Sequence, residues 1–186
     1  DISYEYGIFA TPLGELGVLA VSAQYLSVNK LAEIDKTGAL TGDSFTPNDM
    51  AASAIYAKQF GVVDFGVSAK YINSKILNSA STLAGDIGLQ TRVGKCAFGL
   101  SILNVGQGLK FLDERNSLPT TGRIGASIIL GSKWLVSIDG IAPKGTNPLV
   151  AAGTEYKLTL IQKIKVALRA GYNNRYASSK LGGLAG

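Results

Sequence analysis

Asp86 and Asp139 form the kind of carboxylate pair that could in principle carry out hydrolysis, one as general acid and the other as general base. They lie on separate predicted strands, however, and no recognisable catalytic motif surrounds either residue. The sequence contains no histidine, which removes the usual acyl-transfer machinery as well. We therefore expect the chain not to be an enzyme, and we assign it no catalytic residue.

The single cysteine, Cys96, offers little further chemistry. One cysteine without histidine supports neither a disulfide framework nor a Cys/His metal cluster. Lys95 is the only neighbour in the sequence that favours a reactive thiolate, so we interpret Cys96 as a small apolar residue. We expect no bound cofactor and no metal site.

The distribution of charge does not indicate a nucleic-acid partner. The 186 residues carry 18 lysines and arginines against 13 aspartates and glutamates, a formal net charge of +5. Nucleic-acid-binding proteins cluster their basic residues into a patch or stripe, whereas here they are scattered through predicted turns and polar strand faces. We expect no nucleic-acid partner.

The elements that position these residues are predicted to be β-strands, because apolar and polar side chains alternate along much of the chain. Between Leu83 and Arg92, for example, apolar residues occupy one parity and polar residues the other. Side chains with period two point to opposite faces of a strand. Such a two-faced sheet occurs either on the core of a soluble protein or in the wall of a membrane barrel. No apolar run reaches the roughly 20 residues of a membrane-spanning helix.

Ten segments show this strand pattern. They are Ile2–Ala10, Gly17–Leu26, Met50–Phe60, Asp64–Ile72, Thr82–Val93, Ala97–Val105, Arg123–Leu130, Trp134–Ile141, Val150–Leu160 and Lys165–Tyr172. Met50–Phe60 also has features of a capped, alanine-rich helix. We predict a strand there because the segment lies between a long connection and a tight turn.

The connections between these segments alternate regularly between short and long. The long ones are 27–49, 73–81, 106–122 and 142–149. An up-and-down barrel with tight turns at one rim and loops at the other explains this order, whereas a Greek-key sandwich does not require it. We therefore predict an all-β fold, an antiparallel up-and-down transmembrane β-barrel, in a single domain over residues 1–186.

The alternation assigns side chains to the two surfaces of such a barrel. Polar residues on one parity are the candidates for the lumen: Asp86, Gln90, Arg92, Arg123, Glu155, Lys157, Lys165 and Arg169. Apolar residues on the other parity are the candidates for the lipid face: Ile87, Leu89, Phe98, Leu100, Ile102, Ile128, Leu158 and Leu168. Charged residues within the lumen are expected to pair across strands rather than to bind a specific ligand.

Aromatic residues lie mostly near the ends of the predicted strands: Tyr4, Tyr6, Tyr25, Tyr71, Trp134, Tyr172 and Tyr176. Rings with an apolar body and a polar tip suit a membrane interface. Ordinary strand propensity also enriches aromatic residues, and Tyr56 and Tyr156 fit the interfacial interpretation less well.

Several of these segments resemble the PorV/PorQ-type family of bacterial outer-membrane proteins, relatives of the FadL-type barrels. The resemblance begins in residues 65–72 and 84–89 and continues through an Asn-x-Gly motif at 104–106, a Leu-Lys-Phe motif at 109–111 and a Leu-Pro-Thr motif at 118–120. The motifs in this order are more specific than any one of them, and the similarity spans most of the chain from Tyr4 to Tyr172.

The resemblance implies a location in the bacterial outer membrane and contact with its lipid. Members of the family begin with a Gly/Ala-rich segment and end with closing strands, and neither is found here. We therefore expect this chain to be the central part of a barrel of about fourteen strands, or a diverged shorter barrel, in which Ile2–Ala10 and Lys165–Tyr172 do not pair. No signal peptide is visible, and we expect that segment to have been removed or to lie outside this sequence.

Three functions remain open. PorV-like members act in type IX secretion as shuttles or adaptors for exported cargo, and here the loops 27–49 and 106–122 would contact the secretion machinery or the cargo protein. FadL-like members pass hydrophobic small molecules across the outer membrane. A soluble or self-assembling structural β-protein of the cell surface is the third alternative. In such a protein the apolar side chains of each strand would be buried between the two layers of a sandwich.

Overall fold

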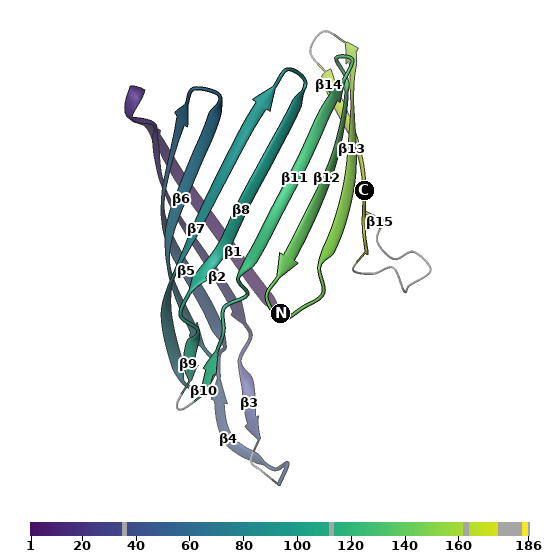
Figure 1. Ribbon diagram of the computed structural model, residues 1–186. Helices are drawn as coiled ribbons and strands as arrows, with labels where there is room; N and C mark the ends of the chain where they lie inside the picture. Colours follow the sequence, from purple (N-terminus) through teal and green to yellow (C-terminus); the bar gives the residue numbers. More distant parts are fainter. Residues whose placement is uncertain (35–36, 112–113, 162–163, 175–183, 186) are drawn as a thin grey trace. The chain divides into compact units, whose positions relative to one another are not determined.

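The computed structural model describes residues 1–34, 37–111, 114–161, 164–174 and 184–185, and in these ranges the protein is all-β. Ten long strands and the two-residue strand β15 form one antiparallel sheet in the order β1-β2-β5-β6-β7-β8-β11-β12-β13-β14-β15 (Figure 1). The long strands are β1 (Ile2–Pro12), β2 (Val18–Val28), β5 (Asn48–Phe60), β6 (Val63–Lys75), β7 (Ser79–Val93), β8 (Cys96–Gly106), β11 (Thr121–Leu130), β12 (Trp134–Pro143), β13 (Leu149–Ile161) and β14 (Ile164–Asn173).

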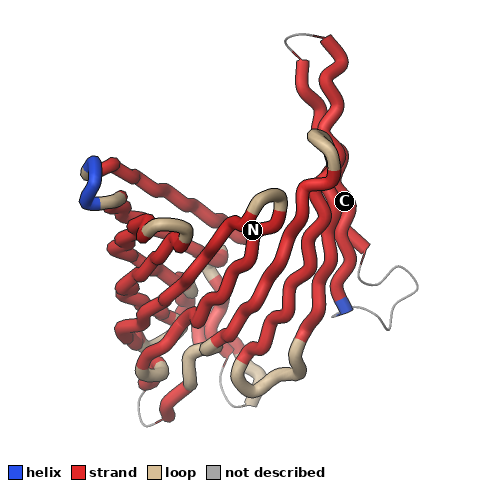
Figure 2. The backbone as a smooth tube through the Cα atoms, turned by 45° about the horizontal axis from the view of Figure 1, so that its top comes forward, coloured by secondary structure: helices blue, strands red, loops and turns tan. Residues whose placement is uncertain are grey.

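Two short hairpins lie outside this sheet. One pairs β3 (Leu31–Ile34) with β4 (Leu40–Phe45), and the other pairs β9 (Leu109–Phe111) with β10 (Glu114–Asn116). A 3₁₀ turn, η1 (Gly14–Leu16), joins β1 to β2 and is drawn in blue between two strands in Figure 2. No helix among the described residues has the length and apolar character needed to cross a membrane.

All ten predicted strands are present, which confirms the all-β prediction. The ambiguous segment around Met50–Phe60 is strand β5, whose backbone pairs with β2 from Asn48 to Ala57. Pairing along the whole segment outweighs the local preference of its alanines for helix, because propensity is a weak term beside tertiary pairing.

The predicted connections need two corrections, and the predicted C-terminal segment needs one. The connection expected at 73–81 is only 76–78, because β6 and β7 extend through polar residues that the apolar pattern does not mark. Asn73 supports this end by donating a hydrogen bond to the carbonyl oxygen of Ala80 (3.4 Å). The loops 27–49 and 106–122 contain the hairpins β3–β4 and β9–β10, which were not predicted. Finally, the C-terminal segment was expected to have no strand, but Leu184–Ala185 pairs with β14.

The described residues show no closed barrel. The chain divides into two compact units: unit 1 (Asp1–Lys58, Gly66–Asp86 and Asn104–Leu118) and unit 2 (Gln59–Phe65, Ile87–Leu103 and Pro119–Gly186). The single-domain interpretation stays a prediction, as do barrel closure and membrane insertion.

In unit 2 the pairing register sorts the side chains of five strands by parity. Residues directly opposite in an antiparallel pair share a face, and the register pairs Leu100 with Ile124, Ile124 with Gly140, and Gly140 with Val150. Even-numbered residues of β8, β11, β12, β13 and β14 therefore form one surface, the apolar face, and odd-numbered residues form the polar face. The charged residues that these strands contribute to unit 2 all have odd numbers: Arg123, Asp139, Glu155, Lys157, Lys165 and Arg169.

The exposure of the two faces is the reverse of that in a soluble sheet packed on a core. On the apolar face of unit 2, Leu100 is 52% exposed and Ile124 is 65% exposed. In unit 1, the buried alanines Ala80 and Ala84 of β7 share the parity of the charged Asp86, whereas Leu83 on the other parity is 70% exposed. The polar parity is thus the more enclosed one, and the apolar parity meets the surroundings.

Strand β1 departs from this arrangement. In unit 1 the apolar residues Leu19 and Val21 of β2 share one face, and Ser22 and Gln24 share the other. The register pairs Tyr6 with Gln24 and Ile8 with Ser22, so the apolar parity of β1 lies on the face to which β2 contributes its polar residues. On the same face, Ile2 is paired with Val28 and Tyr4 with Leu26. The sequence pattern of β1 alone could not reveal this, because alternation does not say which face a neighbour presents.

We predict that Gly106→Ala destabilises the protein by about 1 kcal/mol or more, whereas Gly122→Ala is tolerated. A Cβ at position 106 would clash with the carbonyl oxygen of Leu83 and lie 2.9 Å from the Cα of Ala84. A Cβ at position 122 would have no neighbour within 4 Å. The unfolding midpoint in urea measures both effects, and equal midpoints for the two variants would contradict the close approach of β8 to β7.

Candidate functional site

The most connected polar group of the described residues is Asp86 in unit 1. Its carboxylate lies 2.7 Å from the ammonium of Lys70, accepts a hydrogen bond from the hydroxyl of Ser68 (2.6 Å) and accepts another from the backbone N–H of Asn104 (2.8 Å). Lys70 also donates to the side-chain oxygen of Asn104. These contacts tie together β6, β7 and the end of β8.

Asn104 supplies its backbone N–H to this cluster from an unusual conformation. Its φ angle of 58° lies in the left-handed region, which asparagine tolerates better than most residues. The Asn-x-Gly motif at 104–106 therefore has a structural role: Asn104 turns the backbone toward Asp86, and Gly106 allows β8 to approach β7 closely. Sequence reasoning selected Asp86 but missed Ser68 and Lys70, although both lie on the polar parity of β6.

A second cluster surrounds Glu155 on the polar face of unit 2. The Glu155 carboxylate lies 2.6 Å from Arg169 Nε on the neighbouring strand and 3.3 Å from Lys157 Nζ. The Glu155 side chain is 14% exposed, whereas those of Lys157 and Arg169 are 68% and 71% exposed. The expected pairing across strands is thus confirmed for Glu155 and Arg169. Because Lys157 and Arg169 are largely exposed, solvent and salt weaken these ion pairs.

In the described part of the chain, the other charged lumen candidates, Arg92, Arg123 and Lys165, form no ion pair. Arg123 and Lys165 lie on the polar face of unit 2 through the register of β11 and β14. A Cβ at Gly88 would lie 3.7 Å from Ser101 Cβ, so the even-numbered Gln90 and Arg92 share that face. The eight predicted lumen residues therefore all lie on the polar parity of their strands, in two separate units. Their orientation toward a lumen stays a prediction.

The predicted lipid-facing residues share the opposite parity. Phe98, Leu100, Ile102, Ile128, Leu158 and Leu168 have even numbers in the paired strands of unit 2, and all but Leu158 are exposed. Ile87 and Leu89 lie on the same side of β7, each 44% exposed. Contact of this face with lipid also stays a prediction.

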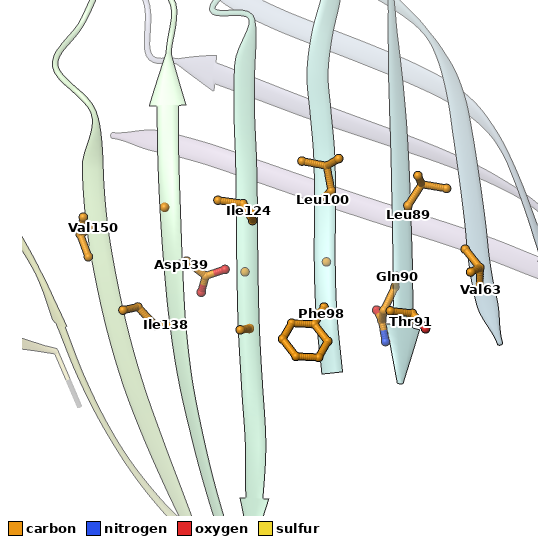
Figure 3. A pocket seen from close by; sticks show the side chains of 14 residues that line it. Val63, Leu89, Gln90, Thr91, Phe98, Leu100, Ile124, Ile138, Asp139 and Val150 are labelled. Atoms are coloured by element: carbon orange, nitrogen blue, oxygen red, sulfur yellow. The ribbon is translucent and has the colours of Figure 1, made fainter. Parts of the chain in front are cut away.

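An open hollow of about 600 Å³ lies on the apolar face of unit 2. Its walls are alkyl and aromatic side chains, among them Leu89, Phe98, Leu100, Ile124 and Ile138, which Figure 3 shows on adjacent strands. The floor is open because Ala126 and Gly140 are small. A hollow lined mainly by alkyl and aromatic side chains suits an apolar group.

The described residues do not assemble a catalytic or metal-binding constellation. Asp86 and Asp139 belong to different units, and the Asp86 carboxylate is already occupied by its three partners. Cys96 is a free, half-buried thiol. Within the described ranges, no group of three or more Cys, Asp and Glu side chains is arranged to hold a metal ion.

The loops 27–49 and 106–122 carry ordered hairpins rather than irregular chain. In β3–β4, Leu31, Ile34 and Leu40 are exposed, although residues 35–36 lie outside the described part. The hairpin β9–β10 is more polar, and residues 112–113 lie outside the described part as well. Exposed apolar side chains on an ordered loop are suited to contact with another protein.

Aromatic residues cluster at the tight-turn end of unit 2. The rings of Trp134 and Tyr156 are perpendicular, with centroids 6.1 Å apart, and the indole N–H of Trp134 donates to the hydroxyl of Thr154. Tyr156 was expected to fit an interfacial cluster poorly, but the register pairs it directly with Trp134. Tyr176 lies outside the described residues.

Comparison with known proteins gives no match: no protein-family model and no curated protein matches this sequence. The resemblance to PorV/PorQ-type proteins therefore stays a prediction.

We predict that Asp86→Ala destabilises the protein by roughly 1–3 kcal/mol, because Lys70 loses its carboxylate partner and the Asn104 N–H loses its acceptor. Asp86→Asn, which keeps an acceptor oxygen, should lie between wild type and Asp86→Ala. Asp64→Ala is the matched control, since Asp64 is exposed and has no ion pair among the described residues. Urea unfolding measures all three variants, and a cost for Asp86→Ala no larger than for Asp64→Ala would refute the role of the cluster.

Proposed function

We propose that this chain forms part of the wall of a bacterial outer-membrane β-barrel of the PorV/FadL-like type and acts without catalysis. The observation that carries the proposal is the exposed apolar face of unit 2, on which the paired strands place no charged residue. Water disfavours such a surface, whereas the hydrocarbon of a bilayer accepts it.

The sorting of charges is too complete to be incidental. If the two faces were equivalent, six strand charges would all fall on the same face only about one time in thirty. In lipid, an arginine or lysine on the outer face of a barrel costs about 2–4 kcal/mol at the bilayer midplane. This cost gives a physical reason for keeping Arg123, Glu155 and Arg169 on the opposite face.

We infer that the task of the barrel is export, with the protein serving as a shuttle or adaptor for secreted cargo. The ordered hairpin β3–β4 supports this inference, because it presents Leu31, Ile34 and Leu40 to the surroundings outside the main sheet of unit 1. Apolar side chains gathered on one exposed hairpin suit contact with another protein.

Passage of hydrophobic small molecules is the second candidate, and strand β1 supports it. Tyr4, Tyr6 and Ile8 are more than half exposed on the face that β1 shares with Ser22 and Gln24 of β2. An apolar strip on the inner side of a barrel would contact a hydrophobic molecule without exposing it to water.

A self-assembling structural protein of the cell surface is a third candidate, and a second layer covering the apolar face would favour it.

A pair of neighbouring substitutions tests insertion into the membrane. Leu89→Arg places a charge on the apolar side of β7, and Gln90→Arg places one on the polar side; both wild-type residues are exposed. We expect Leu89→Arg to reduce the free energy of folding into phosphatidylcholine vesicles by about 2–4 kcal/mol, and Gln90→Arg to change it little. The wild-type protein should require detergent for extraction and change its gel mobility on boiling. Extraction without detergent, or equal effects of the two arginines, would rule out the lipid-facing assignment.

A second experiment separates the adaptor from the passage of small molecules. We expect the triple variant Leu31→Ser/Ile34→Ser/Leu40→Ser to lower the amount of exported protein in the medium several-fold, measured by quantitative mass spectrometry. Uptake of labelled oleate should be unchanged. Leu13→Ser/Leu16→Ser, at the exposed turn η1, is the control. Normal export by the triple variant, together with loss of oleate uptake in Tyr6→Arg, would favour the second candidate instead.

A further inference from the structure

The tight-turn end of unit 2 concentrates basic residues. We call this group the turn rim: Arg92, Lys95, Lys133, Lys157, Lys165 and Arg169. Two backbone hydrogen bonds connect neighbouring turns along it, from Ile129 N–H to the Lys95 carbonyl oxygen (2.9 Å) and from Lys157 N–H to the Lys133 carbonyl oxygen (2.9 Å). Lys95, Lys133 and Lys157 therefore follow one another along the edge of the sheet.

Acidic residues do not neutralise the turn rim. At this end, the described part of unit 2 contains only Asp64 and Glu155. Glu155 is already engaged by Arg169 and Lys157, and no carboxylate partner is found for Lys95 or Lys133 within the described ranges. The opposite end of the described part of unit 2 has only Arg123 and Lys144 as basic residues. The excess of positive charge is thus confined to one end.

The aromatic pair lies directly beside this charge. Trp134 follows Lys133 in the sequence, and Tyr156 precedes Lys157. Both rings belong to the apolar face through the register of β12 with β13. Along the strands of unit 2, from their middle toward the tight turns, the surface therefore changes from aliphatic side chains to amphipathic rings and then to lysines. This is the order in which a bilayer presents its acyl chains, its interface and its phosphate groups.

We propose that the turn lysines of the rim, Lys95 and Lys133, bind the phosphate groups of anionic phospholipids, with the ring pair Trp134–Tyr156 at the level of the glycerol region. Lysine ammonium groups suit this partner because they act as point charges toward phosphate oxygens. The proposal rests on the proposed function, since it requires the apolar face of unit 2 to lie in a bilayer. It adds the chemical class of lipid and the residues that select it.

Trp134 is the single tryptophan of the chain, so its fluorescence reports on the lipid beside the turn rim. The full chain is inserted into phosphatidylcholine vesicles that contain brominated phosphatidylglycerol or, separately, brominated phosphatidylcholine at the same fraction. We expect the brominated anionic lipid to quench Trp134 more strongly, with an association preference several-fold above one. Raising the salt concentration should reduce the preference, because salt screens exposed charges.

The variant Lys95→Gln/Lys133→Gln tests the residues without breaking the Glu155 cluster. Each lysine near an anionic surface contributes about a fivefold preference, so the double variant should lose most of the selectivity. Lys144→Gln, at the other end, is the matched control and should keep it. The shift in gel mobility on boiling verifies that each variant is folded.

The possible outcomes are distinct. Equal quenching by the two brominated lipids in the wild-type protein, or unchanged selectivity in Lys95→Gln/Lys133→Gln, would overturn the proposal while leaving the barrel intact. If inorganic phosphate abolishes the preference and chloride at equal ionic strength does not, the rim binds free phosphate and not lipid. If neither brominated lipid quenches Trp134, the protein is not in the bilayer, and the proposed function itself fails.

Discussion

The pairing register of β8, β11, β12, β13 and β14 is the constraint on which both faces of unit 2 depend. Each antiparallel pair holds directly opposite residues on one side of the sheet, so the parity of one strand is passed to the next. A slip of one residue would move the side chains of a whole strand to the other face. Arg123, for example, would then take the place of Ile124, opposite Leu100 and Gly140. Because this would mix charge into the apolar face, the register is strongly specified.

The polar side is held by short networks rather than by a packed core. Asp86 on β7 collects three donors from β6 and β8 in unit 1, and Glu155 collects two cations in unit 2. Small residues fill the remaining space, and the buried alanines Ala80 and Ala84 lie on the parity of Asp86. Polar contacts and small side chains allow a face to be enclosed without large apolar groups, which remain on the other face. The distribution of apolar surface, and not its total amount, distinguishes this sheet from that of a soluble domain.

The positions of the long strands were predictable because period two is a local property. Nine of the ten predicted segments alternate over enough residues to identify a strand without reference to their neighbours, whereas Met50–Phe60 was identified from its place between a long connection and a tight turn. The extension of β6 and β7 to the connection 76–78 was not predictable in this way, since backbone pairing continues through Asn73 and Ser79 without an apolar signal. The hairpins β3–β4 and β9–β10 were missed because their strands are too short to establish a period.

For the candidate site, the sequence by itself determined which residues could share a face within one strand. It separated Asp86, Gln90 and Arg92 from Ile87 and Leu89, and the structure keeps them on opposite parities. Only the tertiary structure decided which residues of different strands meet: Lys70 with Asp86, Trp134 with Tyr156, and the apolar side of β1 with the polar side of β2. The physical reason is that alternation is fixed by backbone geometry within a strand, whereas contact between strands depends on register, which residues distant in the sequence set together.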